Sequence, residues 1–168
     1  LDSRDLVRTF ATGFGEGIEP ILVDDRHQRI YVARGEKEEQ RGIGMFTPEG
    51  TLVREFGGAI FSADTEGLSI YACGDEGYLL AADQNRTATE IEVFERTSLV
   101  HLGTFRLRNA QGEATGATDG IAVLQAPLPG FAGGLLAVCD GCGSMPRDEM
   151  DIAAWDRVAT VMGLERCP

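Results

Sequence analysis

Two acidic residues stand two positions apart in the segment Asp64-Thr65-Glu66-Gly67-Leu68, immediately before an apolar run. Carboxylates this close repel each other unless a cation or basic side chains offset their charge. A second segment of this kind places Glu113 and Asp119 just before the apolar run that begins at Ile121. Because Ca²⁺ takes about six to eight oxygen ligands, acids that converge from several strand entrances predict a site for a hard cation.

Turn chemistry is the alternative explanation for acids at these positions. An Asp at a strand entrance often caps a turn through its own side chain, and Thr-Asp-Gly is an ordinary turn sequence. For Asp119 both interpretations stay open, whereas the close pair Asp64 and Glu66 favours a cation. Other polar residues are predicted to lie at solvated hairpin tips or on the surface: Asp24, Asp25, Asp75, Glu76, His27 and His101.

The composition bounds the class of protein that must position these acids. The 168 residues are 43% hydrophobic and 25% charged, which is the balance of one globular domain, and 22 glycines favour many tight turns between short strands. The formal charge of -12 makes nucleic acid a poor partner, because binding a phosphate backbone needs clustered Lys and Arg. No apolar run approaches the length of a membrane span, so no membrane partner is expected.

Four cysteines, Cys73, Cys139, Cys142 and Cys167, are too few and too spread to define a disulfide scaffold. Cys139 and Cys142 have the CxxC spacing, but a zinc site would need a second pair of ligands. A thioredoxin-like role is disfavoured because Gly143-Ser144-Met145-Pro146 follows where a helix should open. One or two local disulfides, or free thiols, are the alternatives that remain.

An internal repeat predicts the architecture. The similar segments Leu6-Val7-Arg8-Thr9-Phe10, Leu52-Val53-Arg54-Glu55-Phe56 and Leu102-Gly103-Thr104-Phe105 recur roughly every 50 residues, a period that fits a four-stranded propeller blade. We therefore expect an all-β fold of about three four-stranded β-propeller blades, over approximately 14–57, 58–108 and 109–147. In the second unit, Ile91 and Val93 alternate with Glu92 and Arg96, as in a half-buried strand.

The tail of the chain departs from strand periodicity. Apolar residues recur at helical spacing and acids stand in the first turn, so a short C-terminal helix is predicted over approximately 148–163, packed on the last blade as a cover. The apolar positions of this helix are Ile152, Trp155, Val158, Ala159 and Met162.

The motifs together resemble the β-propeller phytases, calcium-dependent secreted phosphatases that act on inositol hexakisphosphate. The resemblance rests on the Asp-x-Glu-Gly-Leu element at Asp64, on Gly77-Tyr78-Leu79-Leu80, on Thr118-Asp119-Gly120-Ile121 and on the C-terminal Trp155-Asp156-Arg157-Val158-Ala159. It implies a Ca²⁺ cofactor, with Asp64 and Glu66 as the catalytic residues. The metal ligands that it implies are Glu19, Asp64, Glu66, Gln84, Glu113 and Asp119.

This sequence also departs from the family's pattern. Arg34-Gly35-Glu36 replaces a pair of acids, and Cys142-Gly143 stands where the family has a phosphate-binding Asn. Pro20 replaces a Gly next to Glu19, and Glu113 replaces an Asp. The chain corresponds to the C-terminal half of a six-bladed ring, so a second half-propeller, either another copy or a missing N-terminal half, is expected as its partner.

The resemblance implies an enzyme, a phytase-like phosphomonoesterase that hydrolyses phytate or a related phosphate ester by attack of a metal-activated water. A secreted or periplasmic location is expected. Two alternatives are a Ca²⁺-binding propeller module without turnover, and an interaction domain in which the acids only fix loops. Retention of Asp64, Glu66, Gln84 and Asp119 favours the enzyme, while the substitutions at Arg34 and Gly143 favour the binding module.

Overall fold

The computed structural model describes residues 8–15, 17–34, 41–142 and 149–167. Its first sheet contains four antiparallel strands in sequential order: β1 (Ile21–Asp24), β2 (Arg29–Ala33), β3 (Ile43–Phe46) and β4 (Leu52–Phe56). Short turns over 25–28 and 47–51 join β1 to β2 and β3 to β4, and sequential antiparallel order is the result that such short connections favour. This sheet lies within 14–57, the range expected for the first blade, and the boundaries of the blade stay a prediction.

The second sheet repeats the same order with β5 (Asp64–Cys73), β6 (Glu76–Gln84), β7 (Glu90–Glu95) and β8 (His101–Phe105). A two-residue turn links β5 to β6, and Gly74 supplies the positive φ of +63° that such a turn requires. The third sheet has three strands in the order β11-β10-β9, formed by β9 (Ile121–Leu124), β10 (Leu135–Asp140) and β11 (Glu149–Ala154). The all-β, blade-like fold is therefore confirmed, although the third blade has three strands within the described part of the chain.

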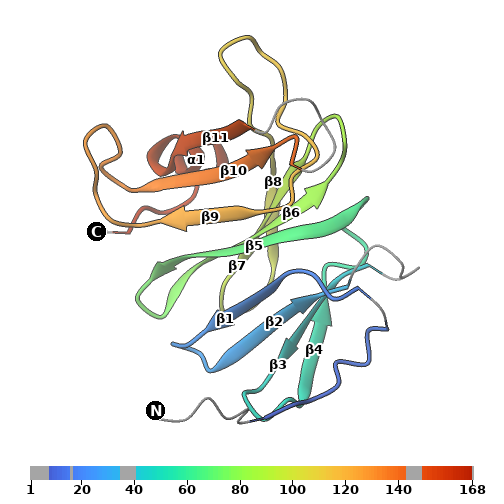
Figure 1. Ribbon diagram of the computed structural model, residues 1–168. Coiled ribbons are helices and arrows are strands. Elements are labelled where there is room, and N and C mark those ends of the chain that lie inside the picture. The colour runs from blue at the N-terminus through green and yellow to red at the C-terminus, as the bar shows by residue number, and fades with distance from the viewer. Residues whose placement is uncertain (1–7, 16, 35–40, 143–148, 168) are drawn as a thin grey trace, which may run out of the picture.

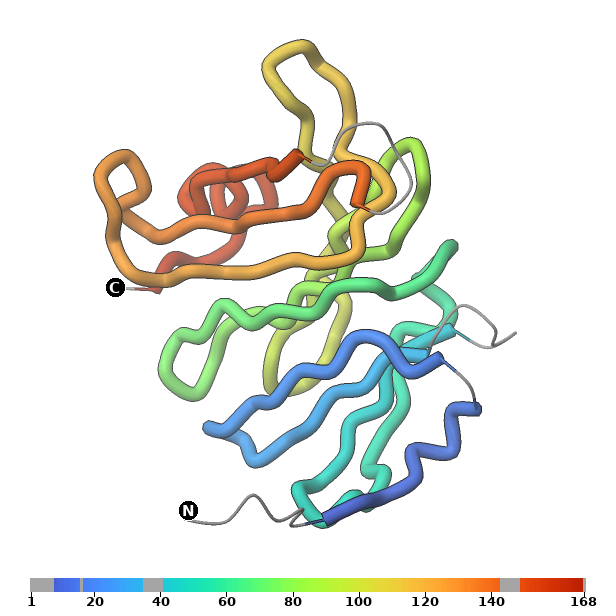
Figure 2. The backbone as a smooth tube through the Cα atoms, in the orientation of Figure 1, coloured from blue at the N-terminus to red at the C-terminus, as the bar shows by residue number. Residues whose placement is uncertain are grey.

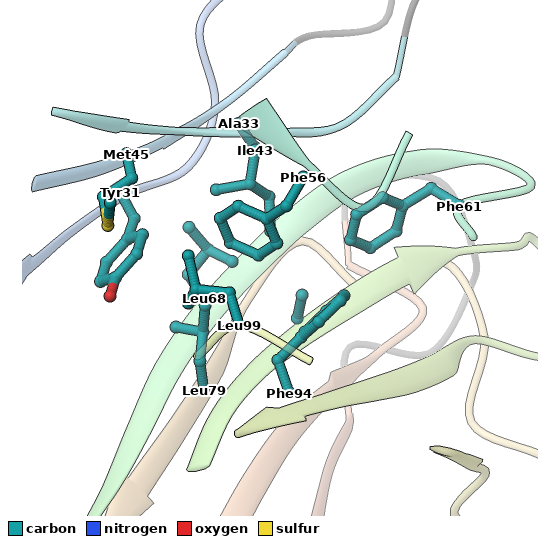
Figure 3. Close-up of a cluster of buried hydrophobic side chains, with 11 residues drawn as sticks. Tyr31, Ala33, Ile43, Met45, Phe56, Phe61, Leu68, Leu79, Phe94 and Leu99 are labelled. Atoms are coloured by element: carbon teal, nitrogen blue, oxygen red, sulfur yellow. The ribbon is translucent and has the colours of Figure 1, made fainter. Parts of the chain in front are cut away.

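The three sheets stack face to face, and β5 contacts both β1 and β9 (Figure 1). A core between the first and second sheets joins Tyr31, Ile43 and Phe56 to Leu79 and Phe94 (Figure 3). A second core lies on the other face of the second sheet. There Trp155 stacks on Tyr71 with ring centroids 3.9 Å apart.

The C-terminal helix is shorter than the sequence predicts. α1 spans Trp155–Met162, and Glu149–Ala154, part of the range predicted as helix, pair with β10 as strand β11. Ile152 is therefore a strand residue that is 55% exposed. The buried side of α1 packs on residues of the second sheet, so the helix covers more than the last blade. Within the described residues, no helix is long and apolar enough to cross a membrane.

Both faces of the second sheet are buried, which corrects the half-buried strand predicted for β7. Glu92 and Arg96 are 2% and 3% exposed, because the first sheet packs on the face that the sequence pattern left for solvent.

Two disulfides, Cys73–Cys167 and Cys139–Cys142, account for all four cysteines. The second is local, which is one of the alternatives that the sequence left open, whereas the first joins the end of β5 to the chain after α1.

Candidate metal centre

The first strands of the three sheets place acids at one end of the molecule. Strands β1, β5 and β9 run in the same direction, so their entrances lie on the same side (Figures 1 and 2). Glu19 precedes β1 by two residues, Asp64 begins β5, and Asp119 precedes β9 by two residues. The entrance of the first strand in each blade thus contributes one carboxylate.

A β-bulge inserts the fourth acid, Glu66, into this group. Thr65 and Gly67 pair with the consecutive residues Asp83 and Ala82, which leaves Glu66 as the extra residue of β5. A bulge locally re-aims a side chain and increases the strand twist. The Asp64-x-Glu66 pair therefore lies inside a strand, rather than immediately before one.

The carboxyl group of Glu66 lies among three other acids. Burial, the nearby charges of Glu19, Asp119 and Asp64, and a hydrogen bond to Glu19 together raise the pKa of Glu66 to about 7. Negative charges close to Glu66 disfavour its ionised form, and a cation bound among these carboxylates would offset their repulsion. The structure therefore brings together four of the six predicted ligands.

Gln84 connects to the same group through β6. It is the cross-strand partner of Asp64, and its side-chain amide donates a hydrogen bond to Asp119 Oδ1 at 2.8 Å. The amide oxygen of Gln84 is a neutral acceptor that can serve as a ligand without adding charge. Next to Asp119, the hydroxyl of Thr118 is fully buried and has no hydrogen-bond partner among the described residues.

The fifth acid of the predicted set, Glu113, belongs to a turn between β8 and β9. Its backbone amide donates to Asn109 Oδ1 at 3.0 Å, and its Oε2 accepts from Asn109 Nδ2 at 3.1 Å. These bonds close the turn. The role of Glu113 as a ligand stays a prediction, as do the ligand and catalytic roles of the other five residues.

Among the described residues, basic side chains offset little of the negative charge. Arg41 Nε lies 3.9 Å from Asp64 Oδ1, while its guanidinium donates to the carbonyl of Ser62 at 2.7 Å. Arg34, which stands where the family has an acid, is committed elsewhere. It pairs with Glu55 at 2.8 Å and lies over the ring of Phe14. The neighbouring Glu36, and Gly143 at the position of the family's Asn, lie outside the described residues.

A buried ion pair escaped prediction from the sequence. Asp24, expected at a solvated hairpin tip, is 1% exposed and accepts two hydrogen bonds from Arg96, at 2.8 Å to Oδ2 and 2.6 Å to Oδ1. Burial alone would raise the pKa of Asp24, but the bonds from Arg96 and His27 hold it well below its ordinary value. His27, expected on the surface, lies 3.0 Å from Asp24 through Nδ1. The two partners are far apart in the sequence, so no local pattern indicates them.

A second group of acids was also missed. Carboxylate oxygens of Asp83, Glu90 and Glu92 all lie within 4.8 Å of one another on β6 and β7. His101, expected on the surface, is half-buried, with Nε2 2.6 Å from Glu92 Oε2. The alternation of Glu92 with Ile91 and Val93 is the available signal, but by itself it predicts a solvated face.

The cavity of about 1200 Å³ beside the β5–β6 hairpin is not part of this centre. It is lined by Tyr71, Gly74, Tyr78 and Cys167, at the end of β5 opposite to Asp64. Because no acid of the candidate centre lines this cavity, we do not assign the cavity to the candidate metal centre.

Comparison with known proteins gave one family. The chain matches the phytase family model over residues 5–166, a range that includes all six predicted ligands. A search of curated proteins found no match.

Proposed function

Because the chain belongs to the phytase family, we propose that it is a calcium-dependent phosphomonoesterase that acts on phytate or a related phosphate ester. The observation that supports calcium most directly is the crowding of Glu19, Asp64 and Asp119 around the half-buried Glu66. Burial and these neighbouring charges together raise the pKa of Glu66 to about 7. An all-oxygen donor set of this kind suits a hard cation. Bound there, Ca²⁺ would activate a water and polarise a phosphoryl oxygen.

The proposed roles of the protein groups follow from their positions. Glu19 and Asp119 hold the cation from the entrances of β1 and β9, and Gln84 orients Asp119 through its hydrogen bond. With a pKa of about 7, Glu66 is about half protonated at neutral pH in the metal-free site, and it would have to be deprotonated to serve as a ligand. Asp64 and Glu66 together orient the attacking water and accept its proton.

A partner half-ring and an oxidising location complete the proposal. Three blades leave the outer face of the third sheet uncovered, where Leu124, Met150 and Ile152 are 43%, 60% and 55% exposed. We propose that a second half-propeller, another copy or a separate N-terminal half, covers such faces. The two disulfides support a secreted or periplasmic location, because disulfides persist in oxidising compartments.

Glu66→Gln tests the enzyme. The substitution removes one charge from the centre of the cluster, so Ca²⁺-dependent phosphate release from phytate should fall by roughly 100-fold or more. The assay compares phosphate release in excess Ca²⁺ and in EDTA. Asp25→Asn is the matched control, because this exposed acid lies in the β1–β2 turn, at the other end of β1. Unchanged release by Glu66→Gln would show that the site is wrong.

A Ca²⁺-binding module without turnover is the second candidate. The observation that favours it is Arg34, which replaces a family acid and is held by Glu55 and Phe14. This candidate predicts Ca²⁺ or inositol phosphate binding by calorimetry without release of phosphate. Steady turnover by the purified chain would exclude it.

A further inference from the structure

A second acidic group lies on the face of the β5–β6 ladder opposite to Asp64 and Gln84. Asp83 pairs directly with Glu90 across β6 and β7, and Glu92 follows two residues later on the same face. Side chains of directly paired residues, and of residues two apart on one strand, project from the same face of a sheet. This register explains how carboxylate oxygens of all three acids come within 4.8 Å of one another.

The protein fixes the Asp83 carboxylate with donors from one loop. Ser62 donates to Asp83 Oδ2 through its backbone amide at 2.8 Å and its hydroxyl at 2.9 Å, and the Ala63 amide donates to Oδ1 at 2.7 Å. An ionised carboxylate has about four acceptor positions. These three bonds fix the position of the Asp83 carboxylate and leave it capacity for one more partner.

Donors to the two glutamates also leave acceptor positions open. His101 and Thr104 both bind Glu92 at Oε2, each at 2.6 Å. Arg106 binds Glu90 Oε1 at 2.6 Å, but its side chain is 47% exposed, so solvent screens that pair. The bonds described here therefore fall on one oxygen of each glutamate.

An unpartnered hydroxyl supplies the independent sign of a ligand. Thr65 is 2% exposed, and its Oγ1 has no hydrogen-bond partner in the part of the chain that the structure describes. Thr65 is the direct cross-strand partner of Asp83, so its side chain leaves β5 on the face that carries the three acids. A buried hydroxyl without a partner is unfavourable, and a cation beside Asp83 would satisfy it.

We propose that Asp83, Glu90, Glu92 and the Thr65 hydroxyl bind a hard divalent cation of the Ca²⁺ class, separate from the candidate centre. All four ligands are oxygens, and Ca²⁺–oxygen distances of about 2.3–2.6 Å place ligand oxygens on opposite sides of the ion about 5 Å apart. The spacing of the three carboxylates fits within that limit. A cation here holds together the ends of β5, β6 and β7.

The inference does not depend on the proposed phosphatase activity. It concerns a cation on the reverse face of the strands that carry Asp64, Glu66 and Gln84. The two sites can therefore be separated by mutation. The double variant Glu66→Gln/Asp119→Asn disables the candidate centre and serves as the background in which the second site is measured.

Calorimetric titration of the EDTA-stripped 168-residue chain with CaCl₂ tests the proposal. In the Glu66→Gln/Asp119→Asn background, one Ca²⁺ should still bind, and adding Glu90→Gln should weaken this binding by about tenfold or more, because it removes a charged ligand. Glu76→Gln is the matched control, since this exposed acid starts the same strand, β6, at its other end. It should leave Ca²⁺ binding unchanged.

Thr65→Val gives a test that does not depend on charge. Valine replaces only the hydroxyl, so in EDTA the thermal midpoint should stay equal or rise, because an unsatisfied buried group is lost. In Ca²⁺ the same variant should lose several-fold in affinity and show a smaller Ca²⁺-induced rise of the midpoint than the parent chain. Opposite effects with and without Ca²⁺ distinguish a lost ligand from damaged packing.

Two results would overturn the proposal. One is a background variant that binds no Ca²⁺ while the parent chain does, which would assign all binding to the candidate centre. The other is unchanged Ca²⁺ affinity in both Glu90→Gln and Thr65→Val. If only the proposed phosphatase function were wrong, the background variant would still bind Ca²⁺, but the parent chain would release no phosphate.

Discussion

At the scale of single residues, Glu66 is the side chain whose environment says most about the centre. It is half-buried and has Glu19, Asp64 and Asp119 as neighbours, and burial with these charges raises its pKa to about 7. A carboxyl group in this state competes with a cation for the same oxygens, because a ligand must be deprotonated to bind metal.

Ca²⁺ binding should therefore depend on pH near neutrality. Below a pH of about 7 the metal-free Glu66 is protonated, so binding must displace one proton, and the apparent Kd should rise about tenfold for each pH unit lowered. Above that pH the dependence should level off. Calorimetry at pH 6, 7 and 8 measures it, and the Glu66→Gln chain should show no such slope between these values. An equal slope in both chains would assign the proton to another group.

The same scale includes the buried pair of Asp24 and Arg96. Arg96→Leu leaves the Asp24 carboxylate buried without its main donor, so the free energy of unfolding should fall by about 3–5 kcal/mol. Urea denaturation at pH 7 measures the change. Arg26→Ala, which breaks the exposed pair with Asp75, is the control and should shift the midpoint little.

The stabilisation by this pair also has a definite pH dependence. The folded-state pKa of Asp24 is lowered from an ordinary value of 3.8, so its contribution is present above about pH 4 and is lost as the pH falls further. The parent chain and Arg96→Leu should therefore differ less in stability at pH 2.5 than at pH 7. A constant difference would mean that Arg96 acts by packing alone.

At the scale of elements, the approach of β9 to β5 sets the distance between Glu66 and Asp119. Gly67 makes that approach possible, since a Cβ at this position would lie 2.8 Å from the backbone nitrogen of Ile121. The bulge at Glu66 immediately precedes this glycine. The glycine and the bulge together bring acids of neighbouring blades into one group.

Gly67→Ala should therefore affect stability and metal binding together. The added methyl group pushes β9 from β5, which should destabilise the chain by about 1–3 kcal/mol and weaken Ca²⁺ binding at the candidate centre. Gly120→Ala is the control, because a Cβ there has no neighbour within 4 Å. Thermal unfolding and calorimetry measure the two effects. If Gly67→Ala destabilised the chain but left its Ca²⁺ affinity unchanged, the β5–β9 contact would not be needed for metal binding.

At the scale of the whole molecule, both outer sheets expose apolar side chains. Phe10 and Phe14 pack on Val32 and Phe46 and cover part of the outer face of the first sheet, where Ile21 and Val23 stay 65% and 62% exposed. On the third sheet, Met150 and Ile152 of β11 remain more than half exposed. Apolar sheet faces of this kind mark interaction surfaces or aggregation sites.

We therefore expect the isolated chain to associate through the outer face of the third sheet. Light scattering should give a mass above that of one chain, and the double variant Met150→Lys/Ile152→Lys should return it to the monomer. Lys replacement of the exposed Val161 on α1 is the control, because this residue lies outside the sheet. A monomeric parent chain would show that the face does not pair with a second copy.

The sequence by itself determined the repeating strands and most of the acids that the structure gathers. Alternating apolar residues and turn residues are local signals, and they predict the strands of the first two sheets and two strands of the third. The pair Asp64 and Glu66 was found because two acids so close in the chain are electrostatically unusual. Glu19 and Gln84 came from the family resemblance alone.

Only the tertiary structure decided what each strand face meets. The alternation in β7 separates Glu92 from Ile91 correctly, but no local pattern reveals that both faces are buried, that of Glu92 by the first sheet and that of Ile91 by the core around Trp155. The pairing of Asp24 with Arg96 and of Cys73 with Cys167 joins residues far apart in the chain. These contacts exist because whole sheets stack face to face, and the same stacking brings three strand entrances to one centre. The order of residues within one sheet does not specify how that sheet packs on its neighbours.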